Sequence, residues 1–255
     1  MKLHQIIFSP TGGTRRVGKC LADAMKANYD NGETVELCAR PENISLPCIG
    51  NDDLVVVAMP VFAGRVPALA VERLRKVESN GARCVAVVVY GNRAYDDALL
   101  ELCDLCKELG FKVIAAIGAV AEHSVVRKYG QGRPDAEDVK ILQGFVEKIA
   151  EKVACGNETV PQVPGNRPYK KPMAGPHPTA GKKCNACGIC SKGCPVGAIS
   201  LDNIKKVDKK KCVSCMRCVA VCPEGATSIG MVMNFLVAQM IKKPCSTRKT
   251  VELFV

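Results

Sequence analysis

The sequence predicts an α/β domain with a doubly wound parallel sheet, followed by a small cysteine-rich α+β domain. Short apolar runs alternate with helical segments through residues 1–155. This part holds 20 Lys/Arg and 20 Asp/Glu, whereas residues 156–255 hold 16 and 5, so the second part supplies the whole net charge of +11. Regular cysteine arrays also occur only in the second part. The change in both charge and cysteine spacing predicts two domains.

The first 155 residues contain five short apolar segments typical of strands. The segments 53–59 and 84–90 are apolar without alternation, as strands buried on both faces are. Helical segments separate the strands, which predicts right-handed crossovers and a five-stranded parallel sheet with helices on both faces. The predicted strands are 3–8, 33–38, 53–59, 84–90 and 112–120, and the predicted helices are 15–28, 67–78, 95–109 and 135–153.

A proline-rich stretch follows the first domain. Residues 156–183 carry six prolines and cannot form a regular helix or a central strand. We expect a semi-rigid linker there. The predicted units are a first domain at 1–155, the linker at 156–180, a second domain at 181–230 and a tail with a helix at 231–255.

Three loops follow strands of the predicted sheet: 9–14, 60–67 and 90–97. Ligands of such sheets bind outside the carboxyl ends of the strands, so we expect the three loops at one edge. The first loop, SPTGGT, leads into a helix N-terminus, which favours an anion such as phosphate. It lacks the lysine of a P-loop and the spacing of a dinucleotide fingerprint. The alternative is a capped turn before a helix.

Aromatic side chains fall in the other two loops. Phe62 and Tyr95 are two of only eleven aromatic residues, and a bound planar ring needs flat faces to stack on. Gly64 and Gly91 allow the backbone to approach the edge of such a ring. The alternative is that the two aromatic side chains cap the local core.

The loop SPTGGT resembles the phosphate loop of flavodoxins, and the resemblance extends over about residues 1–153. It implies a flavodoxin-like fold that binds FMN, although this domain is neutral where flavodoxins are usually acidic. Carried over, the phosphate site would comprise Ser9, Thr11, Gly12, Gly13 and Thr14. The ring site would comprise Pro60, Val61, Phe62, Ala63, Gly64, Tyr90, Gly91, Asn92 and Tyr95.

The strongest motif is a duplicated cysteine run. Residues 184–195 and 212–223 both read C-x₂-C-x₂-C-x₃-C-P, and the second run starts 28 residues after the first. This spacing predicts two 4Fe–4S clusters in which the fourth cysteine of each run binds the other cluster. Structural zinc, the alternative, fits two runs of four poorly. One predicted set is Cys184, Cys187, Cys190 and Cys222, and the other is Cys212, Cys215, Cys218 and Cys194.

Residues 180–229 resemble bacterial two-cluster ferredoxins. The whole chain therefore resembles the flavodoxin–ferredoxin fusion proteins of anaerobes. That resemblance implies an electron-transfer protein that passes electrons between FMN, two 4Fe–4S clusters and a redox partner. The alternatives are a flavin-dependent oxidoreductase that acts on a small molecule or nicotinamide, and a redox-responsive regulatory module. The sequence leaves open whether the chain is an enzyme, and no catalytic residue is predicted.

Lysines surround the cysteine runs, with five in the segment 205–211. They form either a solvated turn or a basic rim that attracts an acidic redox partner. No nucleic-acid-binding motif accompanies the charge, and we expect no nucleic-acid partner. The sequence shows no signal peptide or membrane span, and sixteen cysteines without a secretory signal indicate a cytoplasmic protein.

Two further features remain open. His123 and Ser124 follow the last predicted strand at the presumed ligand edge. They are either part of a polar connecting loop or, for His123, a proton donor to a small substrate. The segment 227–242 is either a helix that covers the second domain or an exposed docking surface.

Overall fold

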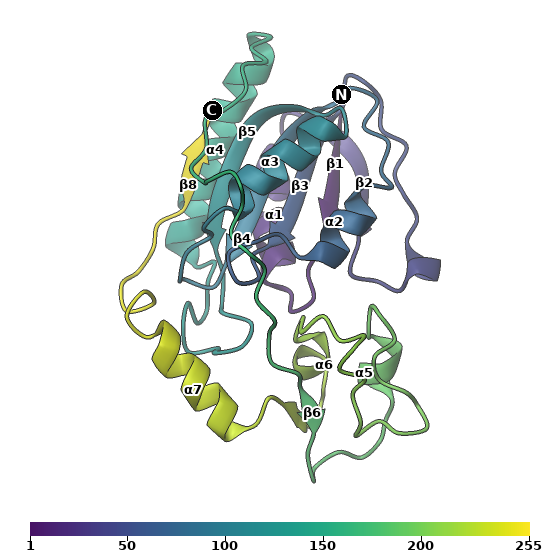
Figure 1. Ribbon diagram of the computed structural model, residues 1–255. Helices are drawn as coiled ribbons and strands as arrows, with labels where there is room; N and C mark the ends of the chain where they lie inside the picture. Colours follow the sequence, from purple (N-terminus) through teal and green to yellow (C-terminus); the bar gives the residue numbers. More distant parts are fainter.

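The computed structural model describes all 255 residues and contains a six-stranded sheet between two helical layers (Figure 1). The strand order is β2-β1-β3-β4-β5-β8. The first five strands are mutually parallel, and β8 pairs antiparallel with β5. The strands are β1 (Lys2–Ile7), β2 (Asp30–Glu36), β3 (Leu54–Pro60), β4 (Arg83–Tyr90), β5 (Lys112–Val120) and β8 (Glu252–Phe254).

The sheet is buried on both faces, as its apolar strands require. Every residue of β3 is buried. The helices α2 (Ala68–Leu74) and α3 (Ala98–Glu108) pack on one face, and α1 (Gly13–Met25) and α4 (Ala136–Ala154) pack on the other. The order 2-1-3-4-5 of the parallel strands is the flavodoxin-like order, and the predicted fold class is confirmed.

The sequence did not indicate the sixth strand. β8 has only three residues and lacks a hydrophobic pattern long enough to stand out. It forms because the edge of β5 offers unpaired backbone groups. The C-terminal segment therefore returns to the first domain instead of ending as a separate tail.

The cysteine-rich region lies below the carboxyl edge of the sheet (Figure 1). A two-stranded antiparallel sheet of β6 (Thr179–Ala180) and β7 (Thr227–Ser228) brings the two ends of the cysteine-rich region together. Each cysteine run contains one short helix, α5 (Ile189–Lys192) or α6 (Arg217–Ala220). The helix α7 (Met231–Ile241) follows, and one further turn, η1 (Pro41–Asn43), lies after β2. None of the helices has the length and apolar character needed to cross a bilayer.

The proline-rich stretch lies against α3 and is held there by polar contacts. Arg167 and Tyr169 both bond to the Asp104 carboxylate, with the arginine at 2.6 and 2.8 Å. Asp97 accepts hydrogen bonds from the backbone N–H groups of Asn166 and Lys170. These contacts fix the course of the connection between the first domain and the cysteine-rich region.

Candidate functional site

The carboxyl ends of four strands surround one cavity. The loop after β1 contributes its threonines, and the segments after β3, β4 and β5 form the other walls. The three loops that the sequence predicted to meet therefore do meet, and a fourth joins them. The lining residues are Pro10, Thr11, Gly13, Thr14, Pro60, Val61, Phe62, Val89, Tyr90, Gly91, Ala121, Glu122 and Ser124.

The loop after β1 leaves the start of α1 open. Gly12 precedes the helix with a φ of 90°, a conformation that favours glycine, and as a glycine it offers no capping side chain. One N–H group of the first turn is nevertheless capped from outside the helix, which agrees with the alternative interpretation of this loop. Ser9 is buried and lies outside the cavity lining, where its Oγ accepts a 2.9 Å hydrogen bond from the Arg15 N–H. Ser9 shapes the loop, while the helix keeps free N–H groups that can bind an anion.

Glu36, at the end of β2, stabilises the loop after β1 through hydrogen bonds. Its carboxylate accepts hydrogen bonds of 3.0 Å from the backbone N–H groups of Ser9 and Cys38, and one of 2.6 Å from the Arg15 guanidinium. Sequence reasoning missed Glu36. A carboxylate at the carboxyl end of the neighbouring strand was the only signal that could have pointed to it.

Only part of the predicted ring site lines the cavity. Five predicted residues do so, namely Pro60, Val61, Phe62, Tyr90 and Gly91, whereas Ala63, Gly64, Asn92 and Tyr95 do not. Gly91 permits a close approach, because a Cβ on it would lie 2.6 Å from Cδ2 of His123.

Tyr95 and Asn92 instead bind the C-terminal segment. The Tyr95 hydroxyl donates a 2.8 Å hydrogen bond to Glu252 of β8, and its ring packs edge-on against Tyr90 at 5.3 Å. Burial and the Glu252 carboxylate raise the pKa of Tyr95. Asn92 donates to the carbonyl oxygens of Cys245 and Thr247.

His123 has a structural role in the loop after β5. Its Nδ1 accepts hydrogen bonds from the backbone N–H groups of Val125 (3.2 Å) and Val126 (3.1 Å). Burial lowers the pKa of His123 to about 4, so the ring is neutral near pH 7. A neutral ring that stabilises a turn is a poor proton donor, which favours the connecting-loop interpretation over the substrate-directed one.

Four cysteines from both runs line a second cavity. Cys194 of the first run lies there with Cys212, Cys215 and Cys218 of the second run. The loop between Cys212 and Cys218 contains two residues with positive φ, Ser214 and Met216. The other lining residues are apolar except Arg217, and burial raises the pKa of the Cys215 thiol to about 11. This is the grouping that the crossed arrangement of the two runs predicts.

The remaining four cysteines are more exposed. Cys187 is exposed, Cys184 and Cys222 are partly buried, and Cys190 is buried. Burial raises the pKa of the Cys222 thiol, but backbone hydrogen bonds from Ala226 and Thr227 outweigh it and lower the pKa overall. The Ala226 N–H lies 3.2 Å from the Cys222 sulfur, and the Ala198 N–H lies 3.3 Å from the Cys194 sulfur. The fourth cysteine of each run thus receives an equivalent backbone hydrogen bond.

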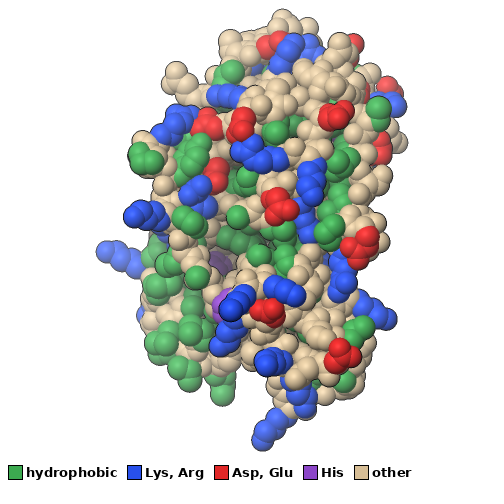
Figure 2. Space-filling model, turned by 45° about the vertical axis from the view of Figure 1, so that its right-hand side comes forward, with side chains coloured by type: hydrophobic (Ala, Val, Ile, Leu, Met, Phe, Trp, Pro, Cys, Tyr) green, Lys and Arg blue, Asp and Glu red, His purple; other side chains and the backbone are tan.

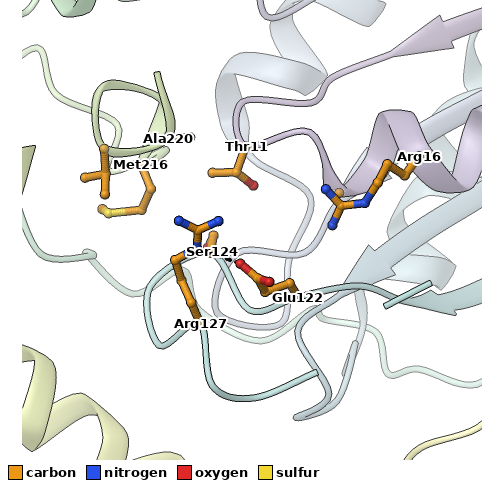
Figure 3. Close-up of a pocket in the computed structure, with 9 residues that line it drawn as sticks. Thr11, Arg16, Glu122, Ser124, Arg127, Met216 and Ala220 are labelled. Carbon is orange, nitrogen blue, oxygen red and sulfur yellow. Dashed lines mark hydrogen bonds and ion pairs between the residues drawn. The ribbon is translucent and has the colours of Figure 1, made fainter. Parts of the chain in front are cut away.

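A third, polar pocket shares lining residues with both cavities (Figure 3). The loop after β1 contributes Thr11 and Gly13, and the α6 region contributes Met216, Val219 and Ala220. In Figure 3, Thr11 faces Met216 and Ala220, with Arg127 and Glu122 of the loop after β5 beside them. Since Met216 also lines the cysteine cavity, one short segment separates the two candidate sites.

Two arginines fix this juxtaposition. The buried Arg73 of α2 donates to the carbonyl oxygens of Leu37, Ala39 (2.6 Å) and Pro195 (2.8 Å). Arg40 donates to the carbonyl oxygens of Ser191 (2.8 Å) and Lys192 (3.1 Å). Both arginines connect the first domain to the backbone on either side of Cys194.

Comparison with known proteins agrees with this geometry. Residues 183–228 match the family model described as a 4Fe-4S dicluster domain. The chain joins a flavodoxin-like domain to a 4Fe–4S dicluster domain. The match confirms the prediction of two 4Fe–4S clusters and supports an electron-transfer role, while the flavodoxin-like fold follows from the strand order of the sheet.

Several solved structures are similar to the first domain. A flavodoxin from the domain Archaea is 18% identical, with a TM-score of 0.42 over 60% of this chain and 99% of that one. The Streptococcus pneumoniae TIGR4 flavodoxin is 17% identical, with a TM-score of 0.43 over 60% and 99%. Rubredoxin oxygen:oxidoreductase from Desulfovibrio gigas is 12% identical, with a TM-score of 0.44 over 60% of this chain and 36% of its own. No curated protein matches the chain in sequence.

The cysteine cavity of the dicluster domain fits a cluster better than a single metal ion. Four thiols from the two runs line one cavity, as the ligands of one cluster would. Arg217 also lines this cavity, and its Nε is buried without a hydrogen-bond partner. An unpaired buried donor is costly unless a ligand accepts from it, and the sulfur atoms of a cluster are such acceptors.

The grouping of cysteines predicts the effect of Cys194→Ala. Wild-type protein purified without oxygen should contain about eight iron atoms, and the variant about four. Electron paramagnetic resonance should show that the lost cluster is the one next to Cys212, Cys215 and Cys218. Cys245→Ala is the control, because Cys245 lies outside both runs and should leave the iron content unchanged. Retention of that cluster with loss of the other would contradict the crossed arrangement.

The unpaired donor of Arg217 predicts a change in cluster potential. Arg217→Met removes a positive charge and an N–H donor, both of which favour the reduced, more negative cluster. We expect the potential of this cluster to fall on the order of 59 mV, which corresponds to a tenfold change for one electron. Lys210→Met removes the same charge from an exposed position and should have a much smaller effect because water screens it. An unchanged potential in Arg217→Met would mean that the guanidinium does not act on the cluster.

Proposed function

We propose that this chain is an electron-transfer protein that passes electrons between a bound FMN and two 4Fe–4S clusters, and from there to a redox partner. One observation carries the proposal. The pocket at the domain junction is lined by the loop after β1 and by α6, so the flavin cavity and the buried cysteine cavity adjoin. When bound, FMN would accept two electrons together and release them one at a time. The residues of the chain would determine where it lies.

FMN fits the cavity at the carboxyl edge of the sheet. The open N-terminus of α1 would hold its phosphate, with the hydroxyl groups of Thr11 and Thr14 beside it. Phe62 and Tyr90 would border the isoalloxazine ring. Ser9 and Gly12 would support the phosphate by shaping the loop.

The cysteine sets suggest the order of the electron path. The set of Cys194, Cys212, Cys215 and Cys218 lies next to the flavin cavity and is enclosed by hydrophobic residues. We assign the other cluster to Cys184, Cys187, Cys190 and Cys222, where Cys187 is exposed. An electron would therefore pass from the flavin to the buried cluster, then to the more exposed one, and leave there.

An acidic protein is the partner that the surface favours. Lys205, Lys206, Lys209, Lys210 and Lys211 are all exposed in the connection between the two runs. Only Lys211 has a carboxylate nearby, Asp208 at 4.0 Å. These exposed lysines would steer an acidic surface toward the cysteine-rich region.

The phosphate assignment predicts the effect of Thr14→Val. This change removes a hydroxyl group and keeps the shape of a buried side chain, so the fold should persist. Because hydrogen bonds to charged groups contribute about 1.5–3 kcal/mol, FMN should bind roughly 10- to 100-fold more weakly, and riboflavin should be unaffected. Thr34→Val is the control, since Thr34 contacts Gln5 in the sheet. Equal weakening of FMN and riboflavin would argue against a phosphate at this loop.

Transfer within one chain is the direct test of the function. A light pulse with a photoreductant, under anaerobic conditions, should first reduce the flavin of a fraction of the molecules. The flavin should then reoxidise while the cluster absorbance bleaches, at a rate that does not depend on protein concentration. A rate that rises in proportion to concentration would show transfer between chains and would contradict the proposal.

A further inference from the structure

The helix α7 presents hydrophobic side chains to solvent on most of its surface. Only Ala238 and Ile241 are buried, against Val126 in the loop after β5. Six of the thirteen exposed large hydrophobic residues of the whole chain belong to this one helix. Their exposed fractions are 90% for Met231, 75% for Val232, 45% for Met233, 61% for Phe235, 55% for Leu236 and 63% for Met240.

The helix is attached to the first domain and does not cover the cysteine-rich region. The Tyr129 hydroxyl donates to the Ala238 carbonyl at 3.1 Å, and the Asn234 amide donates to the Val125 carbonyl at 3.3 Å. One polar side chain of α7 thus faces the protein, while its hydrophobic side chains face outward. This settles the question that the sequence left open for this segment in favour of an exposed surface.

The surroundings of α7 are basic. No Asp or Glu occurs from Ala226 to Val251. Lys242 and Lys243 directly follow the helix, are exposed and form no ion pair. Lys128 lies over the ring of Tyr129, which contacts the helix. Figure 2 shows hydrophobic side chains gathered at the lower left, on the side where Figure 1 draws α7, with Lys and Arg side chains nearby.

We propose that α7 binds the surface of an anionic lipid bilayer, with its hydrophobic side chains at the boundary between headgroups and acyl chains. A helix that protrudes needs no complementary groove when it inserts into lipid, and the lysines that follow α7 are long enough to reach the headgroups. Anionic headgroups would attract Lys242 and Lys243. Self-association through α7 is less favourable, because it would bring Lys242 and Lys243 of two chains together. The helix has eleven residues and would lie on the bilayer, not cross it.

Vesicle sedimentation of the intact holoprotein tests this proposal. Wild-type protein should bind vesicles that contain phosphatidylglycerol and phosphatidylcholine, and should bind pure phosphatidylcholine much more weakly. The triple variant Val232→Ser, Phe235→Ser, Leu236→Ser should lose at least tenfold in affinity. Replacing Lys242 and Lys243 by Gln should weaken binding to the anionic vesicles roughly fivefold for each lysine, and added salt should reduce the difference.

A matched control changes three exposed hydrophobic residues elsewhere. Leu46→Ser, Val160→Ser, Met173→Ser removes side chains that are 40%, 49% and 62% exposed, and it should bind vesicles like the wild type. Flavin and cluster absorbance should be equal in all variants, which shows that the fold persists. Absence of binding to any vesicle, or equal binding of the wild type and the α7 triple variant, would overturn the proposal. A wild-type dimer that the α7 variant abolishes, without vesicle binding, would assign the surface to self-association instead.

Discussion

The buried guanidinium of Arg73 connects the two halves of the molecule. It is 5% exposed and has no carboxylate partner, and it donates to three carbonyl oxygens. Two of these, on Leu37 and Ala39, follow β2, and the third belongs to Pro195 beside Cys194. A buried charge is tolerated only where its donors are satisfied, so the three carbonyls must remain together. This requirement holds the cysteine cavity against the edge of the sheet where the flavin cavity opens.

The returning C-terminal segment provides a second attachment between the halves. Asn92 donates to two carbonyls of this segment and accepts from the Lys249 N–H and the Arg133 guanidinium, which uses its full hydrogen-bonding capacity. Arg133 also pairs with Asp138, and both side chains are buried. The cysteine-rich region is therefore connected to the sheet by chain at both of its ends. Two covalent connections and two sets of buried polar contacts restrict its rotation more than a single linker could.

The sequence predicted what depends on local patterns. Buried strands such as 53–59 are continuous apolar runs, and the cysteine spacing follows from the shape of a cluster, so both could be identified without the structure. β8 and Glu36 could not, because each acts through a partner distant in sequence, and the cysteine spacing does not show that the Arg217 side chain lines the cavity. Tyr95 and Asn92 were predicted to border the ring site because they lie in the loop after β4. In the structure both side chains bind the C-terminal segment instead, which is also distant in sequence. Short polar loops carry little information about which of two neighbours they contact.

The environment of the buried cysteine set explains why an unpaired cationic donor lies there. Adding an electron to a cluster increases its negative charge, and a site enclosed by hydrophobic side chains has little water to stabilise that charge. Fixed donors must do so instead, and the cavity offers the Arg217 Nε and the backbone N–H of Ala198. The more exposed set can rely on solvent near Cys187. Two clusters with duplicated ligands would therefore differ in potential because their surroundings differ. The second run has Arg217 where the first run has Ile189.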